Sequence, residues 1–325
     1  MSNPGYCMSL DQNRAKLVAA LPSDRVALLL AGGDGMRLQE LTREIAGAPI
    51  PKQYCRLLQG SSLLEVTLRR AQLFSGRERI NIVVNQNHLG LAAEQLRAFP
   101  QQNIFVQPLN RDTGPGMLFA LLRIEQTHPD AIIGVFPTDH YVDDDRAFVA
   151  HILRASNTIA RLPDKIAILG IAPDRPETGY GYIIPSAPTR IAEKTYHVQA
   201  FVEKPNLPTA QSIIGRGGLW NTFVMVFRLA RMMELLCQFV PDEFRTLCEL
   251  RESPGKAAAL YQTLSSWNLS TALLARIPQH LILFEVADVS WSDWGTRESV
   301  ERTYHALNLV PSWNQPGVIS SQIHP

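Results

Sequence analysis

The stretch "VALLLAGGDGMRL", residues 26–38, joins an apolar run of strand length to a turn that has three glycines in four positions and is followed by Arg37. Glycines let backbone N–H groups approach an anion closely, and the arginine adds a cation beside them. The turn lacks the third glycine of the GxGxxG fingerprint and the GK[ST] ending of a P-loop. By itself it predicts either an anion-binding turn or a tight strand-to-helix turn without a ligand.

Outward from this stretch, apolar runs of strand length alternate with helical patterns. The strand-like runs lie at 26–31, 80–85, 103–107, 131–136 and 166–171, and patterns with apolar residues at three-to-four spacing lie at 62–74, 89–99, 116–126 and 146–160. Such alternation is typical of α/β proteins. It predicts an α/β fold class with a mixed, mostly parallel central sheet and helices on both faces.

The pattern of predicted strands and helices changes after residue 171. Runs at 173–185, 198–206 and 219–227 are predicted as shorter strands joined by Pro/Gly loops, followed by helices at 229–240 and 254–267 and a strand at 281–286. We interpret this part as a substrate-facing half of the same fold. The predicted organisation is an N-terminal extension at 1–24, one domain at 25–304 with halves at 25–171 and 172–304, and a loose tail at 305–325.

Composition narrows the class of partner. The 325 residues carry 31 basic and 30 acidic side chains without a long basic block, which favours small-molecule partners over nucleic acid or a membrane surface. The four cysteines form no CxxC pair, and the histidines show no zinc-site spacing. The N-terminus lacks the features of a secretory signal, and no apolar run approaches 18 residues. We therefore expect a cytoplasmic protein with free thiols.

Two aspartates are candidate metal ligands. In an open parallel sheet the ligand crevice lies outside the carboxyl ends of the strands, and Asp139 follows such a strand in "FPTDH". Asp293 lies far away in "SWSDWG". Mg²⁺ takes one or two protein carboxylates together with phosphate oxygens, so the two aspartates would suffice if the fold brings them together. The alternative for each is a turn or cap, and Asp144 or Asp145 is predicted to cap the helix at 146–160.

Two further stretches place cations at predicted strand ends or turns. In "IPKQY", Lys52 follows a proline that fixes the local backbone, and the alternative is a solvated surface lysine. In "FVEKPN", a strand ends in Glu203 and Lys204. Neighbouring side chains on a strand point to opposite faces, so both could serve one ligand only if the strand ends there, as Pro205 indicates. The alternative for this pair is a surface ion pair.

The order of these motifs resembles the sugar-1-phosphate nucleotidyltransferases, and most closely the mannose-1-phosphate guanylyltransferases. The matching elements, running from residue 30 to 295, are "LAGGDGMRL", "PKQY", "NRDTGPG", "FPTDH", "TGYGYI", "FVEKPN", "LWNTFVMVF" and "WSDWG". The resemblance implies a Rossmann-like nucleotide-diphospho-sugar transferase fold with a nucleotide-binding half and a sugar-phosphate half. It also implies a reaction in which a sugar-1-phosphate attacks the α-phosphorus of a nucleoside triphosphate and releases pyrophosphate, with GTP and mannose-1-phosphate as the favoured pair.

The resemblance also implies roles for individual residues. Arg37 and Lys52 would stabilise the pyrophosphate as the catalytic cations, and Asp139 and Asp293 would hold Mg²⁺. The nucleotide would be bound by Ala31, Gly32, Gly33, Gly35, Asn110, Thr113 and Gly114. The sugar phosphate would be bound by Gly179, Glu203, Lys204 and Asn221. The implied partners are a nucleoside triphosphate and a sugar-1-phosphate, and a homodimer is an oligomeric state that the sequence leaves open.

Several positions depart from the family pattern. Met36 stands where the family has a threonine, "NRDTGPG" stands where guanylyltransferases show NRNTAPA, and "AGAPI" lengthens the loop before Lys52. A nucleotidyltransferase for another base and sugar pair is therefore an alternative. A catalytically silent homologue that binds a sugar nucleotide and regulates a partner is another. A third alternative, a dinucleotide-dependent oxidoreductase, would account for the alternating α/β pattern but not for the motifs "FVEKPN" and "SWSDWG".

Overall fold

The computed structural model describes residues 24–58, 60–252, 257–311 and 313. Within these residues, nine strands form one sheet in the order β3-β2-β1-β4-β9-β6-β10-β8-β7, and β5 and β11 form a separate pair. The strands are β1 (Arg25–Ala31), β2 (Ile80–Asn85), β3 (Ile104–Gln107), β4 (Ile132–Pro137), β5 (Tyr141–Val142), β6 (Ile166–Ile171), β7 (Gly181–Pro188), β8 (Thr195–Glu203), β9 (Leu219–Arg228), β10 (Leu281–Val286) and β11 (Trp291–Ser292).

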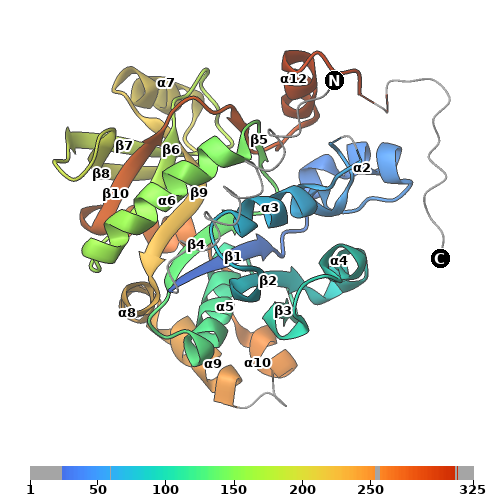
Figure 1. Ribbon diagram of the computed structural model, residues 1–325, viewed down its shortest axis with the longest axis vertical. Coiled ribbons are helices and arrows are strands. Elements are labelled where there is room, and N and C mark those ends of the chain that lie inside the picture. Colours follow the sequence, from blue (N-terminus) through green and yellow to red (C-terminus); the bar gives the residue numbers. More distant parts are fainter. Residues whose placement is uncertain (1–23, 59, 253–256, 312, 314–325) are drawn as a thin grey trace, which may run out of the picture.

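Helices connect these strands and cover the sheet (Figure 1). The longer ones are α2 (Gln39–Ala46), α3 (Leu63–Gln72), α4 (Leu89–Leu96), α5 (Thr113–Thr127), α6 (Asp145–Arg161), α7 (Leu207–Gly215), α8 (Leu229–Phe239), α9 (Pro241–Glu252), α10 (Ala257–Thr263), α11 (Leu269–Ala272) and α12 (Arg297–Ala306). Short 3₁₀ turns include η1 (Met36–Leu38) and η2 (Lys52–Tyr54). As predicted, Asp144 caps α6, because its carboxylate accepts from the backbone N–H groups of Arg146 and Ala147, both at 2.9 Å.

Most strands of the large sheet run in one direction. Strand β1 pairs in parallel with β2 and β4, β2 with β3, and β6 with β10, whereas β8 and β9 run antiparallel to their neighbours. The predicted α/β class with a mixed, mostly parallel sheet is confirmed. The carboxyl ends of β1 and β4 therefore open on the same edge, where the glycine turn and Asp139 follow them.

Strand β9 joins the two parts of the sheet. On one side, β4 pairs with the second half of β9, where Ile132 is opposite Arg228. On the other side, β6 pairs with both halves of β9, and β7 pairs with its first residues through Trp220. The strands after residue 171 thus complete the sheet that the earlier strands begin. The prediction that they are shorter is wrong, because β7, β8 and β9 hold 8, 9 and 10 residues. Pro185 does not end β7, since a register shift between Ile184 and Pro185 accommodates it within the strand.

Alternating residues of β1 face two separate hydrophobic layers. Val26 and Leu28 pack with the side that carries α5 and α8, whereas Ala27 and Leu29 pack with the side that carries α3 and α6. This period of two is what a strand buried on both faces requires. The helices predicted on both faces of the sheet are present there (Figure 1).

A third, smaller core lies beside the sheet. It packs Leu41 of α2 against Val300 and Tyr304 of α12, with Trp294 fully buried among them. Helix α12 continues to Ala306, and Leu309 packs against the same core. The first residues of the tail that was expected to be loose are therefore ordered.

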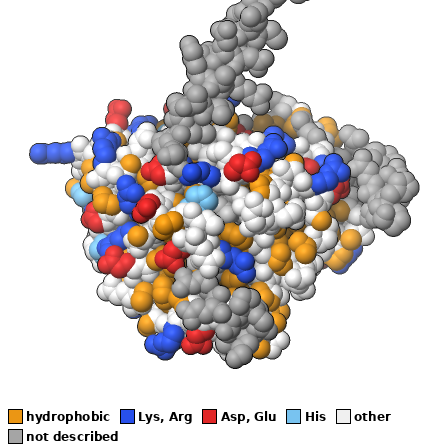
Figure 2. All heavy atoms as spheres, turned by 60° about the horizontal axis from the view of Figure 1, so that its bottom comes forward, with side chains coloured by type: hydrophobic (Ala, Val, Ile, Leu, Met, Phe, Trp, Pro, Cys, Tyr) orange, Lys and Arg blue, Asp and Glu red, His pale blue; other side chains and the backbone are white. Residues whose placement is uncertain are grey.

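The surface shows no separation of charge on the face drawn in Figure 2, where basic and acidic side chains are interspersed. None of the helices in the described ranges is both long and apolar enough to cross a membrane. The predicted extension up to residue 23, the cysteine at position 7 and the first residues of the helix expected at 254–267 lie outside the described residues.

Candidate active site

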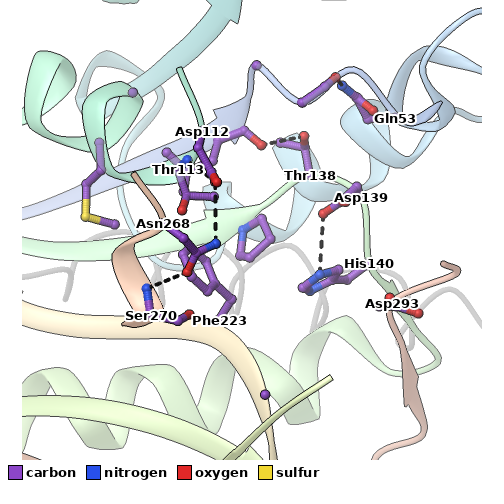
Figure 3. A pocket seen from close by; sticks show the side chains of 18 of the residues that line it. Gln53, Asp112, Thr113, Thr138, Asp139, His140, Phe223, Asn268, Ser270 and Asp293 are labelled. Atoms are coloured by element: carbon purple, nitrogen blue, oxygen red, sulfur yellow. Dashed lines mark hydrogen bonds and ion pairs between the residues drawn. The ribbon is translucent and has the colours of Figure 1, made fainter. Parts of the chain in front are cut away.

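A cleft of about 570 Å³ gathers residues from both parts of the sheet. Most of the residues predicted from the sequence line it (Figure 3). They are Gly32, Gly33, Gly35, Arg37, Asn110, Thr113, Asp139, Gly179, Glu203, Lys204, Asn221 and Asp293. Ala31, Lys52 and Gly114 do not belong to the lining, because each is buried behind it or packed against another segment.

Close packing of neighbouring segments requires glycine at two positions of the turn after β1. Gly35 has a φ of 60°, and a Cβ there would lie 3.0 Å from backbone atoms of both Pro51 and Lys52. A Cβ at Gly32 would overlap the side-chain amide of Gln107, whereas Gly33 faces open space. The turn thus presents bare backbone to the cleft, which is the geometry that anion binding needs.

The "PKQY" motif supports this turn from behind. The side-chain amide of Gln53 donates to the carbonyl oxygen of Gly33 at 2.7 Å, and the hydroxyl of Tyr54 donates to that of Ala31 at 2.7 Å. Both side chains are buried. The sequence reading singled out only Lys52 in this motif and missed its two neighbours, which fix the shape of the turn.

The β5–β11 pair brings the two predicted metal ligands to one cleft. Ser292 is opposite Tyr141 and Trp291 is opposite Val142 in this short antiparallel pair. Asp139 lies two residues before β5, and Asp293 directly follows β11. The convergence that the sequence could not establish is therefore present, and it depends on two strands of two residues each.

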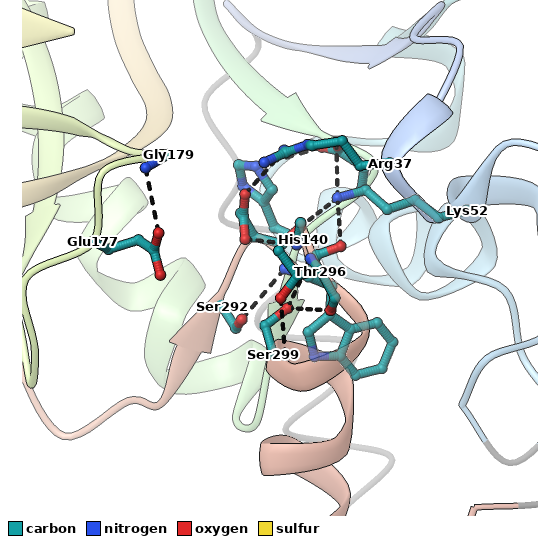
Figure 4. A network of polar contacts seen from close by, with 12 residues as sticks. Arg37, Lys52, His140, Glu177, Gly179, Ser292, Thr296 and Ser299 are labelled. Atoms are coloured by element: carbon teal, nitrogen blue, oxygen red, sulfur yellow. Dashed lines mark hydrogen bonds and ion pairs between the residues drawn. The ribbon is translucent and has the colours of Figure 1, made fainter. Parts of the chain in front are cut away.

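Lys52 lies at the centre of a polar network behind these aspartates (Figure 4). Its ammonium is 3.3 Å from Oδ2 of Asp139 and donates to the carbonyl oxygens of Asp293 and, at 3.1 Å, Trp294. The residue is only 4% exposed, so the alternative of a solvated surface lysine is wrong. Direct contact between Lys52 and a pyrophosphate stays a prediction, since here its ammonium is surrounded by protein oxygens.

The two aspartates have different surroundings. One oxygen of Asp293 accepts from the N–H of Gly295 at 2.7 Å, and the other lies 3.3 Å from the guanidinium of Arg37. Burial opposes ionisation of Asp139, but the ammonium of Lys52 outweighs it and lowers the pKa of this carboxyl. The side chain of Asp139 remains 41% exposed toward the cleft. Asp139 is thus held ionised and accessible.

His140 is a cleft residue that the sequence reading missed. Its Nε2 lies 3.4 Å from Oδ1 of Asp139, and its ring packs edge-on against Trp291 with centroids 5.1 Å apart. Burial lowers the pKa of His140, which favours the neutral imidazole. The only signal in the sequence is its position next to Asp139.

The sugar-side residues converge at the end of β8. The strand ends at Glu203, and Lys204 takes a φ of 46°, which turns the chain so that both side chains line the cleft. The expectation that the strand ends at this point is confirmed. The two charges are 3.9 Å apart, and the Lys204 side chain is 61% exposed. Asn221 lines the cleft from β9, and Gly179 lines it from the turn before β7.

The "NRDTGPG" segment forms the start of α5. Asp112 caps this helix and accepts from the N–H of Thr113 at 2.6 Å. The amide of Asn110 donates to Asp34 at 2.8 Å, so this predicted nucleotide ligand also ties the glycine turn to α5. Gly114 packs directly against the ring of Trp267, which is why it does not line the cleft.

Another missed group comes from the segment that runs from the loop after α10 into α11. Ser266, Asn268 and Ser270 line the cleft, although the sequence predicts a helix through residue 267. Helix α10 ends at Thr263, and Asn268 caps α11 by accepting from the N–H of Ser270 at 2.9 Å. The signal that could have found the break is this asparagine, a residue type that favours helix N-caps.

The described residues fit a magnesium site that substrate oxygens would complete better than a site made only of protein ligands. Among them, no group of three or more His, Cys, Asp or Glu side chains has an arrangement that could hold a metal. Asp139 and Asp293 nonetheless face the same cleft, and one of them is exposed. One or two carboxylates plus phosphate oxygens and water are what Mg²⁺ uses at nucleotide sites.

Sequence comparisons place this chain among known proteins. The model of a family described as nucleotidyl transferase matches residues 26–308. The xanthan biosynthesis protein XanB of Xanthomonas campestris pv. campestris (strain B100) is 32% identical over 289 residues, covering 86% of this chain and 59% of that protein. The mannose-1-phosphate guanylyltransferase 2 of Escherichia coli O157:H7 is 31% identical over 296 residues, covering 85% and 59%. The chain thus spans less than two thirds of the length of these relatives.

Structural comparison agrees with the sequence matches. A Thermus thermophilus protein described as a mannose-1-phosphate geranyltransferase superposes with a TM-score of 0.76 at 28% identity, covering 86% of this chain and 79% of that one. A UDP-glucose pyrophosphorylase solved with UDP-glucose shares only the fold, with a TM-score of 0.55 at 16% identity. The predicted Rossmann-like nucleotide-diphospho-sugar transferase fold is confirmed, and the chain belongs to the nucleotidyl transferase family.

Proposed function

We propose that this protein transfers a nucleotidyl group from a nucleoside triphosphate to a sugar-1-phosphate, with GTP and mannose-1-phosphate as the substrate pair. The observation that carries the proposal is the convergence of the glycine turn, Arg37, Asp139, Asp293 and the Glu203–Lys204 pair on one cleft. The family match and the guanylyltransferase among the relatives support the same reaction class.

The nucleotide end of the cleft suits a triphosphate. Gly33 presents bare backbone to open space, and the Arg37 side chain is 59% exposed. These groups would place the triphosphate and offset the negative charge that develops on pyrophosphate as it leaves. The buried Lys52 would act through Asp139 and Asp293, by holding the acidic residues at the cleft wall.

The opposite end of the cleft suits a phosphorylated sugar. The exposed ammonium of Lys204 would bind the sugar phosphate, and the Glu203 carboxylate would accept from sugar hydroxyls. Asn221 and Gly179 would complete this side. With both substrates held, a phosphate oxygen of the sugar-1-phosphate attacks the α-phosphorus, and the bond to pyrophosphate breaks without a covalent enzyme intermediate.

We also propose Mg²⁺ as the cofactor, held by Asp139 and Asp293. The ion would neutralise phosphate charge when bound. Both aspartates already face cations, Lys52 and Arg37, so the cleft balances acidic and basic groups around the phosphates. Because nucleoside triphosphates are cytoplasmic metabolites, we propose a cytoplasmic location.

The test is a panel of the common nucleoside triphosphates against mannose-, glucose-, fucose- and heptose-1-phosphate, read by pyrophosphate release with Mg²⁺. GTP with mannose-1-phosphate should give the highest kcat/KM. Turnover with another pair only would overturn the specificity and keep the reaction class. Tight binding of a sugar nucleotide without any turnover would instead support the silent regulatory homologue.

A further inference from the structure

The cleft has a wall that the family motifs do not include, formed by residues 266–270, which run from the loop after α10 into the first turn of α11. Every second side chain of this segment, Ser266, Asn268 and Ser270, lines the cleft. All three are polar, whereas Leu269 between them is fully buried. The segment therefore presents hydrogen-bonding groups to the ligand space and an apolar side to the core.

Backbone contacts fasten this segment to the start of α5. The N–H of Gly114 donates to the carbonyl oxygen of Trp267 at 3.1 Å, and the N–H of Leu269 donates to the hydroxyl of Thr113 at 3.1 Å. The ring of Trp267 occupies the space that a side chain at residue 114 would need. The segment and the predicted nucleotide loop thus form one packed unit.

Asn268 connects the segment to the nucleotide side. Its amide nitrogen lies 3.4 Å from Oδ1 of Asp112, the oxygen that also accepts from the N–H of Thr113 (Figure 3). Its amide oxygen caps α11. A single side chain therefore links the N-terminal ends of two helices at the cleft wall.

Ser270 connects the segment to the sugar side. The residue is 2% exposed, and both Ser270 and Glu203 line the cleft. Helix α11, which contains Ser270, contacts β8, the strand that ends at Glu203. Burial raises the pKa of Glu203, while Lys204 and a hydrogen bond from the Ser270 hydroxyl act to lower it. The serine thus favours the ionised carboxylate, the form that accepts hydrogen bonds from sugar hydroxyls.

We propose that the 266–270 segment determines substrate specificity, with Ser270 positioning Glu203 against the hydroxyls of the sugar and Asn268 positioning Asp112 on the nucleotide side. Neither residue belongs to the motifs that carry the family resemblance. The inference rests on the proposed function for the identity of the two ligands. It goes beyond that function by assigning one positioning residue to each substrate.

Two variants with opposite expectations test this assignment. Ser270→Ala should raise the KM for mannose-1-phosphate about fivefold, as expected for one lost hydrogen bond, and leave the KM for GTP unchanged. Asn268→Ser keeps a capping oxygen for α11 and should raise the KM for GTP but not that for mannose-1-phosphate. Thr271→Ala, which removes an exposed hydroxyl of the same helix that does not line the cleft, should change neither.

Three outcomes would overturn the inference. In the first, the variants leave both KM values at the wild-type level. In the second, both variants raise both KM values together with a lower melting temperature, as a purely structural role would. In the third, the effects are exchanged between the two substrates. Selective changes in the two expected directions would support the assignment.

Binding measurements separate this inference from the proposed function. If the wild type releases no pyrophosphate from any pair, the proposed function fails, and calorimetry with GDP-mannose and GDP tests the segment directly. Ser270→Ala should then weaken GDP-mannose about fivefold and leave GDP unchanged. Equal affinities of variant and wild type for GDP-mannose would overturn the inference. A wild type that binds neither compound would overturn both.

Discussion

The ammonium of Lys52, in the turn η2 after α2, lies 3.3 Å from a carboxylate oxygen of Asp139, which follows β4. The lysine is buried and also donates to the backbone of Asp293 and Trp294. It therefore joins η2, the segment after β4 and the loop after β11. The part of the cleft wall that carries the two aspartates is therefore held together by contacts of Lys52.

Replacing this cation should cost both stability and activity. Lys52→Met leaves a carboxylate and two carbonyl oxygens without their partner, and we expect the free energy of unfolding to fall by roughly 3 kcal/mol. Urea denaturation measures this change. Lys204→Met is the matched control, because its exposed ammonium should matter for the sugar-1-phosphate KM and not for stability. Equal stability of the two variants would contradict the structural role of Lys52.

The two aspartates should both be needed for turnover. We expect Asp139→Asn and Asp293→Asn each to lower Mg²⁺-dependent pyrophosphate release at least about a hundredfold, since each removes a negative charge from the cleft. The asparagines keep the size of the side chain, so thermal melting should show folded proteins. Full activity in either variant would remove that residue from the metal assignment.

The glycine turn offers a comparison of neighbouring positions. Gly35→Ala introduces a Cβ at a φ of 60° and 3.0 Å from the backbone of Pro51 and Lys52, so we expect a loss of about 2 kcal/mol in stability. Gly33→Ala meets nothing within 4 Å and should leave stability unchanged. Its effect should appear in the KM for the nucleoside triphosphate. Thermal denaturation and substrate titration of the two variants distinguish these roles.

Stability should fall on mild acidification because of His140. Burial holds its pKa in the folded protein below the ordinary histidine value of about 6.5, so the unfolded chain takes up the proton first. The stability that the neutral imidazole contributes is present above that value and is lost as the pH falls through the folded pKa. His140→Gln should therefore show a smaller loss of stability between about pH 7.5 and about pH 5.5, a range that spans the ordinary histidine pKa of about 6.5.

A histidine elsewhere provides the comparison for this measurement. His305 lies exposed on α12, and His305→Gln should keep the pH dependence of the wild type. Urea denaturation at both pH values gives the difference directly. The same slope in wild type and His140→Gln would show that this imidazole does not drive the effect.

Met36 should be nearly neutral, although it departs from the family pattern. Its side chain is 68% exposed and does not line the cleft. Met36→Thr should change stability by less than about 0.5 kcal/mol and leave the KM for the nucleoside triphosphate unchanged. A large gain in kcat/KM would instead place the hydroxyl of the threonine at the phosphates.

The sequence by itself determined the family, the α/β class and twelve of the residues that line the cleft. It could do so because the strand and helix patterns are local and because the motifs sit at strand ends that one sheet edge brings together. The glycine turn, the end of β8 at Glu203 and the cap at Asp144 all depend on residues within a few positions of each other.

The tertiary structure decided what depends on contacts between distant segments. The pairing of β5 with β11 involves two residues per strand, too few for any periodicity, and yet it places Asp293 beside Asp139. The burial of Lys52 and the contact of residues 266–270 with α5 likewise join segments that are far apart in the chain. Such contacts follow from packing of the complete sheet and its helices, so no local pattern of residues encodes them.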